Sequence, residues 1–227
     1  GGLNNLVNIT NLDLSNCNSL TNIDALSKFV NLTELNLIYC ESLTNIDVLS
    51  KLVNLTRLNL NLSLCKSLTN LNTFLNNKNI TILRLSPLES LTNLDGLDKL
   101  IKITELSFSS CESLTILDGL DKLPNLKSLS FKNLNSLSNI NTFPNLHNLT
   151  KLSLNSCNSL SSLDGISNLF NISKLDLNSC ESLNNIDELA NFPNLTELNL
   201  SYCESLTNIN ALAKLNDLDC LDISECF

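Results

Sequence analysis

The feature that most constrains this chain is a 23-residue repeat that runs through nearly all of its 227 residues. Numbered from its first residue, each unit has apolar side chains at positions 1, 4, 6, 12, 15, 18 and 21 and usually a cysteine at position 9. Successive starts lie 23 residues apart, except for one step of 25, at Ile9, Leu32, Leu55, Ile80, Ile103, Leu126, Leu149, Ile172, Leu195 and Leu218. A unit this short cannot bury its own apolar face, so the units must stack into a solenoid with a continuous core.

Each unit combines two periodicities. Positions 4 to 6 alternate, as in Leu35-Asn36-Leu37, which predicts a short strand. The later apolar positions recur every three residues, which predicts a 3₁₀-like return, and we expect the Asp that often follows position 15 to cap its first turn, as at Asp24 and Asp47. The sequence therefore predicts an α/β solenoid, a curved stack with one parallel sheet on the concave face and short 3₁₀, helical or irregular returns on the convex face.

Residues 32–43 read Leu-Thr-Glu-Leu-Asn-Leu-Ile-Tyr-Cys-Glu-Ser-Leu. This segment resembles the leucine-rich repeat consensus, and the resemblance extends over essentially the whole chain. The tail Ile-x-x-Leu-x-x-Leu at 46–52 is similar to the short repeats of phosphatase-regulator and internalin-type proteins, whereas the Cys-x-x-Leu turn is similar to the cysteine-containing class. The resemblance implies a non-enzymatic module that holds a partner protein or peptide on its concave sheet.

We expect residues 1–227 to form a single solenoid of nine complete units from Ile9 with partial units at both ends. Neither end shows a polar capping repeat, which favours an excerpt of a longer chain. The third unit carries two additional residues within 60–65, and Asn77 replaces its apolar residue at position 21. An irregular return is expected there, with Leu62 and Leu64 inside and Leu75 filling the gap. The alternative is a local binding bump within residues 61–88.

The cysteines form a ladder. Eight of the nine occupy position 9, namely Cys17, Cys40, Cys65, Cys111, Cys157, Cys180, Cys203 and Cys226, and Cys220 lies on a strand. A thiol at position 9 is a weak donor that packs like an apolar group, and the parallel Cβ directions of neighbours and the odd total argue against disulfides. We therefore predict buried free thiols, which favour a reducing, cytoplasmic compartment.

Asn-x-Ser/Thr motifs point to a different compartment. They occur at Asn8, Asn31, Asn54, Asn61, Asn79, Asn148, Asn171 and Asn194, where a eukaryotic secretory pathway would attach glycans. Seven of the eight share one repeat position, so repetition alone explains them. Together with the internalin-like tail, they leave a secreted or cell-surface recognition or adhesion segment as the alternative function and location.

Composition excludes several kinds of chemistry. A formal net charge of −9 lacks the basic footprint of proteins that bind nucleic acids or anionic membranes, and no apolar run approaches the about 20 residues needed for membrane insertion. The single histidine, His147, has no second imidazole with which to share a metal ion. A catalytic serine should be unique, yet Ser recurs at position 11. We predict no catalytic, metal or cofactor site.

The solvent side of the strands is where side chains vary without breaking the stack. Positions 2, 3, 5, 7 and 8 lie there, and a recurrent threonine at position 2 also raises a lattice-binding surface, which a curved, charged face fits poorly. We predict that a protein or peptide binds on the concave face, with no indication of oligomeric state. The candidate contact residues are Glu34, Tyr39, Arg57, Arg84, Glu105, Lys151, Lys174, Glu197 and Tyr202.

Overall fold

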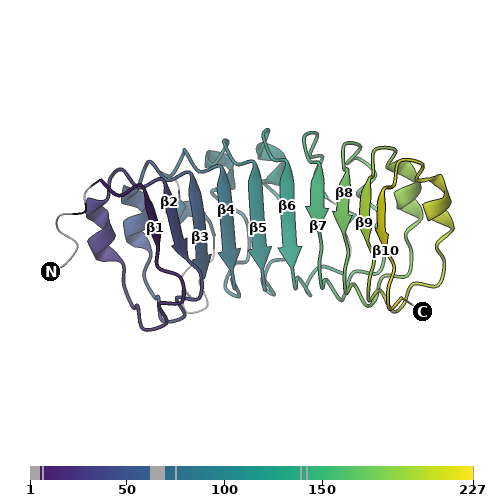
Figure 1. Cartoon of the computed structure of the whole chain (residues 1–227), viewed down its shortest axis with the longest axis horizontal. Coiled ribbons are helices and arrows are strands. Elements are labelled where there is room, and N and C mark those ends of the chain that lie inside the picture. Colours follow the sequence, from purple (N-terminus) through teal and green to yellow (C-terminus); the bar gives the residue numbers. More distant parts are fainter. Residues whose placement is uncertain are drawn as a thin grey trace.

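A computed structural model describes residues 6, 8–61, 70–74, 76–138, 140–141 and 143–226. Ten short strands form one parallel sheet in which each strand pairs with the next one along the chain (Figure 1). The strands are β1 (Asn11–Asp13), β2 (Glu34–Leu37), β3 (Arg57–Asn61), β4 (Ile82–Ser86), β5 (Glu105–Ser109), β6 (Ser128–Lys132), β7 (Lys151–Ser153), β8 (Lys174–Asp176), β9 (Glu197–Asn199) and β10 (Cys220–Asp222).

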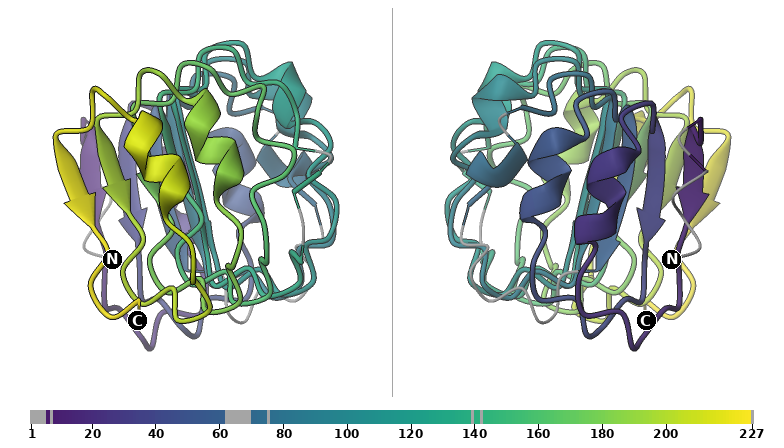
Figure 2. Two further views of the ribbon diagram at one scale, coloured as in Figure 1. Left: turned by 90° about the vertical axis from the view of Figure 1, so that its right-hand side faces the viewer. Right: turned by 90° about the vertical axis from the view of Figure 1, so that its left-hand side faces the viewer.

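Short 3₁₀ helices lie on the other side of the stack. They are η1 (Asp24–Lys28), η2 (Asp47–Lys51), η3 (Asn72–Phe74), η4 (Leu97–Lys99), η5 (Leu120–Lys122), η6 (Asp187–Asn191) and η7 (Asn210–Lys214). Seen along the stack, the strands of both ends stand further out than those of the middle (Figure 2), so the open face of the sheet is concave. The predicted solenoid, with its concave sheet and 3₁₀ returns, is confirmed.

Register follows the repeat. Leu35 of β2 pairs with Leu58 of β3, and Leu175 of β8 pairs with Leu198 of β9. Side chains at positions 4 and 6 of the inner strands are buried and belong to one continuous core. Phe108 and Phe131 replace leucine at position 6 of β5 and β6, and their rings stack with centroids 5.6 Å apart. A buried leucine contributes about 2 kcal/mol, so this interior is the main source of stability.

Two ladders of polar side chains tie each repeat to the preceding one. At position 2, Thr56 Oγ1 donates to the carbonyl of Thr33 over 3.1 Å, and the same bond recurs along the edge of the sheet. At position 23, Asn54 Nδ2 donates to the carbonyl of Val30 over 2.8 Å. The asparagines of the Asn-x-Ser/Thr motifs repeat this contact, with Asn79, Asn148, Asn171 and Asn194 as further donors. Repetition of these motifs therefore has a structural cause.

Asp or Asn at position 5 contributes to ending β8 and β9, although β3 continues past its Asn and β7 ends at a Ser. Asp176 Oδ1 accepts from the backbone N–H of Asn178 over 3.1 Å, and Asn199 Oδ1 accepts from that of Ser201 over 2.9 Å. A side chain that binds its own backbone in this way competes with the sheet, and β8 and β9 end at the residue that provides it. The central strands β4, β5 and β6 have Arg or Ser at position 5 and continue for two further residues.

The turn after most strands uses a left-handed residue at position 8. The φ angle of these residues lies between 53° and 62°, and they are Asn16, Tyr39, Ser110, Asn133, Ser156, Ser179, Tyr202 and Glu225. Their N–H groups donate to the next repeat, for example from Ser156 to the carbonyl of Asn178 over 2.8 Å. The fourth unit has Pro87 at this position. Proline has neither the N–H nor access to positive φ, which explains why this unit diverges.

One expectation about the returns is wrong. Asp24 and Asp47 begin η1 and η2, but their carboxylates make no capping hydrogen bond. The asparagine two residues earlier provides the cap, because Asn45 Oδ1 accepts from the N–H of Asp47 over 2.7 Å, and Asn185 does the same for Asp187. The asparagine lies just before the first turn, so its side-chain oxygen can accept from the otherwise unpaired backbone N–H two residues later.

The third unit is described in its return over residues 70–74 and 76–79. Its return contains η3, and Asn77 is fully buried, with Nδ2 donating to the carbonyls of Leu49 at 2.8 Å and Leu52 at 3.0 Å. An amide that binds two carbonyls of the preceding repeat replaces the apolar contact of the other units. The expected placement of Leu62, Leu64 and Leu75 lies outside the described residues.

Glycine at a left-handed position provides a stability test. Gly165 has φ of 101°, and a Cβ added there would lie 2.3 Å from the Ile140 carbonyl oxygen, whereas a Cβ on Gly119, with φ of 99°, would lie 3.8 Å from its nearest neighbour. We expect Gly119→Ala to lose about 1 kcal/mol of unfolding free energy through backbone strain, and Gly165→Ala to lose about 3 kcal/mol or more because backbone must shift. Urea unfolding measures both, and equal losses would contradict the steric argument.

Candidate functional site

The open face of the sheet carries two parallel rows of side chains. Strand register aligns position 3 of every repeat in one row, which reads Asn11, Glu34, Arg57, Ile82, Glu105, Ser128, Lys151, Lys174, Glu197 and Cys220. Position 5 forms the second row, which reads Asp13, Asn36, Asn59, Arg84, Ser107, Ser130, Ser153, Asp176, Asn199 and Asp222. The charge and polarity of the side chains on the concave face therefore change from strand to strand.

Four of the predicted contact residues neutralise one another. Arg84 Nε donates to Glu105 Oε1 over 2.8 Å, from position 5 of β4 to position 3 of β5. Lys174 and Glu197, neighbours in the position-3 row, form a second ion pair. Both pairs are solvent-exposed, so each contributes little to stability. Their effect is to remove two positive charges from those available to a partner.

Two predicted cations remain without a counterion. Within the part of the chain that the structure describes, the side chains of Arg57 and Lys151 make no hydrogen bond or ion pair. Arg57 lies between Glu34 and Ile82, and Lys151 lies between Ser128 and Lys174. These two side chains are the unpaired positive charges of the position-3 and position-5 rows.

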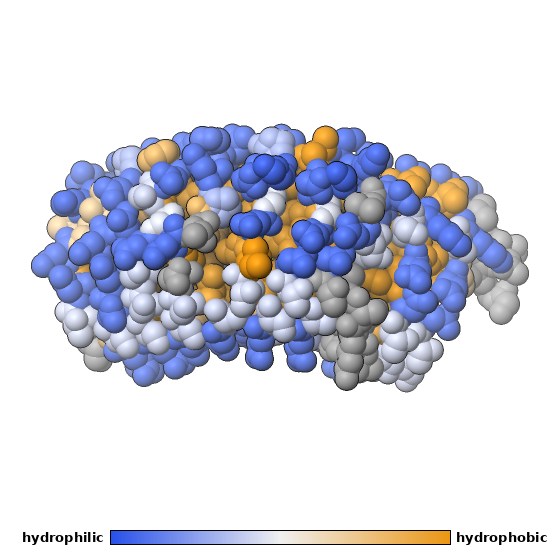
Figure 3. All heavy atoms as spheres, turned by 180° about the vertical axis from the view of Figure 1, so that it is seen from behind, coloured by the Kyte–Doolittle hydropathy of each residue, from blue (hydrophilic) through white to orange (hydrophobic). Residues whose placement is uncertain are grey.

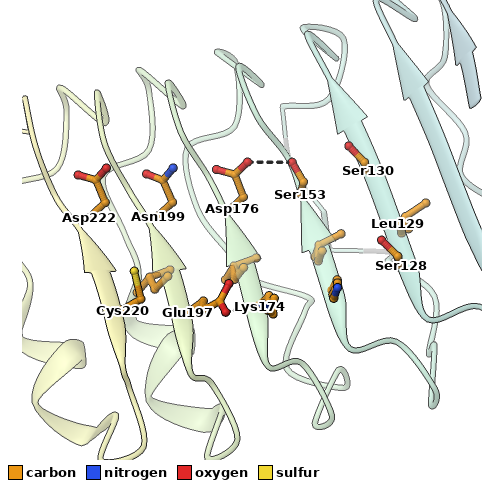
Figure 4. Close-up of a pocket in the computed structure, with 14 residues that line it drawn as sticks. Ser128, Leu129, Ser130, Ser153, Lys174, Asp176, Glu197, Asn199, Cys220 and Asp222 are labelled. Carbon is orange, nitrogen blue, oxygen red and sulfur yellow. Dashed lines mark hydrogen bonds and ion pairs between the residues drawn. The ribbon is translucent and has the colours of Figure 1, made fainter.

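Two hollows divide the concave face. The first, of about 370 Å³, lies over β1 to β3 and includes Glu34 and Arg57. The second, of about 460 Å³, lies over β6 to β10 and includes Lys151, Lys174 and Glu197. Figure 4 shows its two rows: Cys220, Glu197 and Lys174 in one, and Asp222, Asn199, Asp176 and Ser153 in the other. We call the second hollow the C-terminal groove.

The repeat architecture agrees with known proteins. The family model for the BspA type leucine rich repeat region matches residues 3–115 and 101–220. The chain belongs to this leucine-rich repeat family. No curated protein matches it in sequence.

Solved structures support the fold of this leucine-rich repeat protein. An internalin, InlF from Listeria monocytogenes, superposes with a TM-score of 0.62 at 20% identity, over 95% of this chain and 67% of the internalin. The leucine-rich repeat domain of the type III effector XopL superposes with a TM-score of 0.64 at 19% identity, over 94% of this chain and 76% of that one. Identities this low show a shared fold.

Both predicted tyrosines lie at the rim of the leucine-rich repeat sheet. Tyr39 and Tyr202 occupy the left-handed turn position after β2 and β9, and they are 56% and 50% exposed. Neither lines either of the two hollows described above. They could meet only a partner that extends beyond the carboxyl ends of the strands.

Sequence reasoning missed the acidic row of the C-terminal groove. Asp176 and Asp222 line it, but both have structural roles in ending their strands, and Asp222 Oδ1 accepts from the Ser224 hydroxyl over 2.7 Å. These hydrogen bonds lower the pKa of Asp222, so its carboxylate stays ionised at neutral pH. The mixture of Asp, Asn, Arg and Ser at position 5 was the signal that could have revealed this row.

The cysteine ladder is structural. Cys180 Sγ donates to the carbonyl of Leu154 over 3.1 Å, and Cys203 Sγ donates to that of Leu177 over 3.2 Å, each reaching back to position 6 of the preceding repeat. All the cysteines that the structure describes are free, as predicted for them, and Cys65 lies outside this set. Burial raises the pKa of Cys111 to about 12 and that of Cys157 and Cys203 to about 11.

Outside the concave face, the described residues form no comparable arrangement of charged side chains. Figure 3 shows the convex face, where hydrophilic residues cover most of the surface and hydrophobic ones appear between them. His147 is exposed. Across the described ranges, no three His, Cys, Asp or Glu side chains are placed to hold a metal ion, and no helix there has the length and apolarity to cross a membrane.

Thiol reactivity tests the ladder. At pH 8 the buried thiols should stay protonated and shielded, because burial raises their pKa, whereas Cys220 is exposed. Brief iodoacetamide treatment followed by peptide mapping should modify Cys220 and leave Cys111, Cys157 and Cys203 unmodified until urea is added. Cys220→Ser should abolish its signal without exposing the others. Rapid modification of the ladder in the folded protein would contradict this assignment.

Proposed function

We propose that this chain is a non-enzymatic interaction module that binds a partner protein or peptide on its concave face. The observation that carries the proposal is the contrast between the two kinds of polar positions. Threonine at position 2 and asparagine at position 23 repeat, and they are engaged between neighbouring repeats. Positions 3 and 5 vary from strand to strand and lie open to solvent above two hollows.

Variation of this kind suits recognition. A position that holds the stack keeps nearly the same side chain along the chain, and position 2 is threonine in most repeats. The concave face instead presents Arg57 and Lys151 without counterions, together with the carboxylates of half-buried Glu34 and Asp176 and of exposed Asp222. Complementary charges at such positions select a partner and speed its approach more than they add affinity.

For location we propose the reducing cytoplasm, with secretion or surface display as the competing possibility. Free buried thiols support the first. Protein isolated from its source and analysed by intact mass separates the two. Unmodified asparagines and fully reduced cysteines would favour the cytoplasm, and attached glycans would overturn it.

A cross-linked pull-down from the source cells tests the binding face. The bait is the wild-type chain, and the test variant is Arg57→Glu/Lys151→Glu, which reverses the two unpaired cations. The matched control, Lys122→Glu/Lys214→Glu, makes the same charge change on η5 and η7 of the convex face. Captured proteins are identified by mass spectrometry, and the strongest is purified for measurement of its Kd.

We expect the wild type and the convex control to bind this partner equally and the concave variant to bind at least about tenfold more weakly, with an unchanged melting temperature. Equal binding by all three forms would overturn the assignment of the concave face.

A further inference from the structure

The C-terminal groove carries opposite charges on its two sides. On the position-3 side, Lys151 stands next to Lys174, and Glu197 offsets only the charge of Lys174. The groove therefore keeps one net positive charge at β7 on this side. The position-5 side has Asp176 on β8 and Asp222 on β10, separated by Asn199.

The acidic side has no cation of its own. Asp176 accepts from the Ser153 hydroxyl at 3.2 Å and the Asn178 N–H at 3.1 Å, and Asp222 accepts from the N–H and hydroxyl of Ser224. None of these donors is charged, and the described residues contribute no ion pair to either carboxylate. Two carboxylates without a counterion therefore lie in the position-5 row of the groove, where Figure 4 shows Asp176 and Asp222 on either side of Asn199.

The dimensions of the groove suit one polypeptide strand. Positions 3 and 5 of a strand are separated by about 7 Å, which leaves room for a backbone between the two rows. From β7 to β10 are three strand spacings, or about 14 Å, which four or five residues of an extended chain span. Successive side chains of an extended chain point to opposite sides, so one set would meet Lys151 and the other would meet Asp176 and Asp222.

We propose that the C-terminal groove binds an extended peptide that crosses β7 to β10, with an acidic side chain on Lys151 and a basic side chain on the Asp176–Asp222 side. Alternate residues of an extended chain face opposite sides. If the acidic residue of this peptide is at position i, the basic residue is therefore one, three or five residues further along or further back in the sequence. The inference rests on the proposed function of the concave face and specifies the chemistry of the partner at this groove.

The test is selection from a random dodecapeptide display library against the wild type and three variants. Lys151→Glu reverses the basic side of the groove and gives Lys174 a new acidic neighbour. Asp176→Asn/Asp222→Asn removes the negative charges but keeps a side-chain oxygen that accepts from the backbone N–H, as Asn199 does in β9. Lys214→Glu, on η7, is the control for a change of charge outside the groove.

The wild type and Lys214→Glu should enrich peptides with an acidic and a basic residue at these odd separations. Lys151→Glu should lose the preference for the acidic residue, and Asp176→Asn/Asp222→Asn should lose the preference for the basic one. By fluorescence anisotropy, an enriched peptide should bind Lys151→Glu about tenfold more weakly than the wild type at low salt. High salt should weaken binding to the wild type and reduce this difference, because it screens the charges.

Enrichment without charged pairs, charged pairs at even separations, no enrichment at all, or a motif that survives in both groove variants would each overturn the inference. The proposed function is judged separately, because a partner protein lost specifically from Arg57→Glu/Lys151→Glu in the pull-down supports it even when the library selects nothing. If that pull-down also shows no dependence on the concave face, both proposals fail.

Discussion

Burial of leucine between neighbouring repeats is the interaction on which the rest of the structure depends. No unit of 23 residues can enclose its own apolar side chains, so each repeat is completed by the next one. Contact between identical surfaces imposes identical register, and the ten strands consequently pair in chain order. The polar ladders follow from that register, because Thr56 can donate to Thr33 only when equivalent residues stand side by side.

This translational order separates structural side chains from recognition side chains. A residue that donates to the repeat before it, such as Asn54 or Cys180, cannot change to an apolar residue without losing a hydrogen bond between repeats. On the concave face, the side chains at position 3 are not needed to hold neighbouring repeats together. Those at position 5 have a structural role only in some repeats, where they accept hydrogen bonds from the backbone. Function in this leucine-rich repeat protein therefore concentrates where the repeat constrains the sequence least.

Most of the fold can be predicted from the sequence because the same pattern of apolar residues recurs along the whole chain. Strand positions, 3₁₀ returns and the thiol ladder follow from apolar spacing, which depends on local geometry. Capping was misjudged at Asp47, because either Asn45 or Asp47 could have supplied the oxygen and only the backbone path shows that Asn45 reaches the N–H. The structural role of the Asn77 amide was also missed, because its two carbonyl acceptors belong to the previous repeat.

By itself, the sequence determined the solenoid, its register and the two rows of strand residues at positions 3 and 5, since periodicity alone decides them. Only the tertiary structure decided which charges remain available. Arg84 meets Glu105 across a diagonal between β4 and β5, and Lys174 meets Glu197 along a row. Lys151 stands between Ser128 and Lys174 and has no counterion among the described residues. Pairing depends on the distances between side-chain ends on neighbouring strands, which the one-dimensional pattern does not contain.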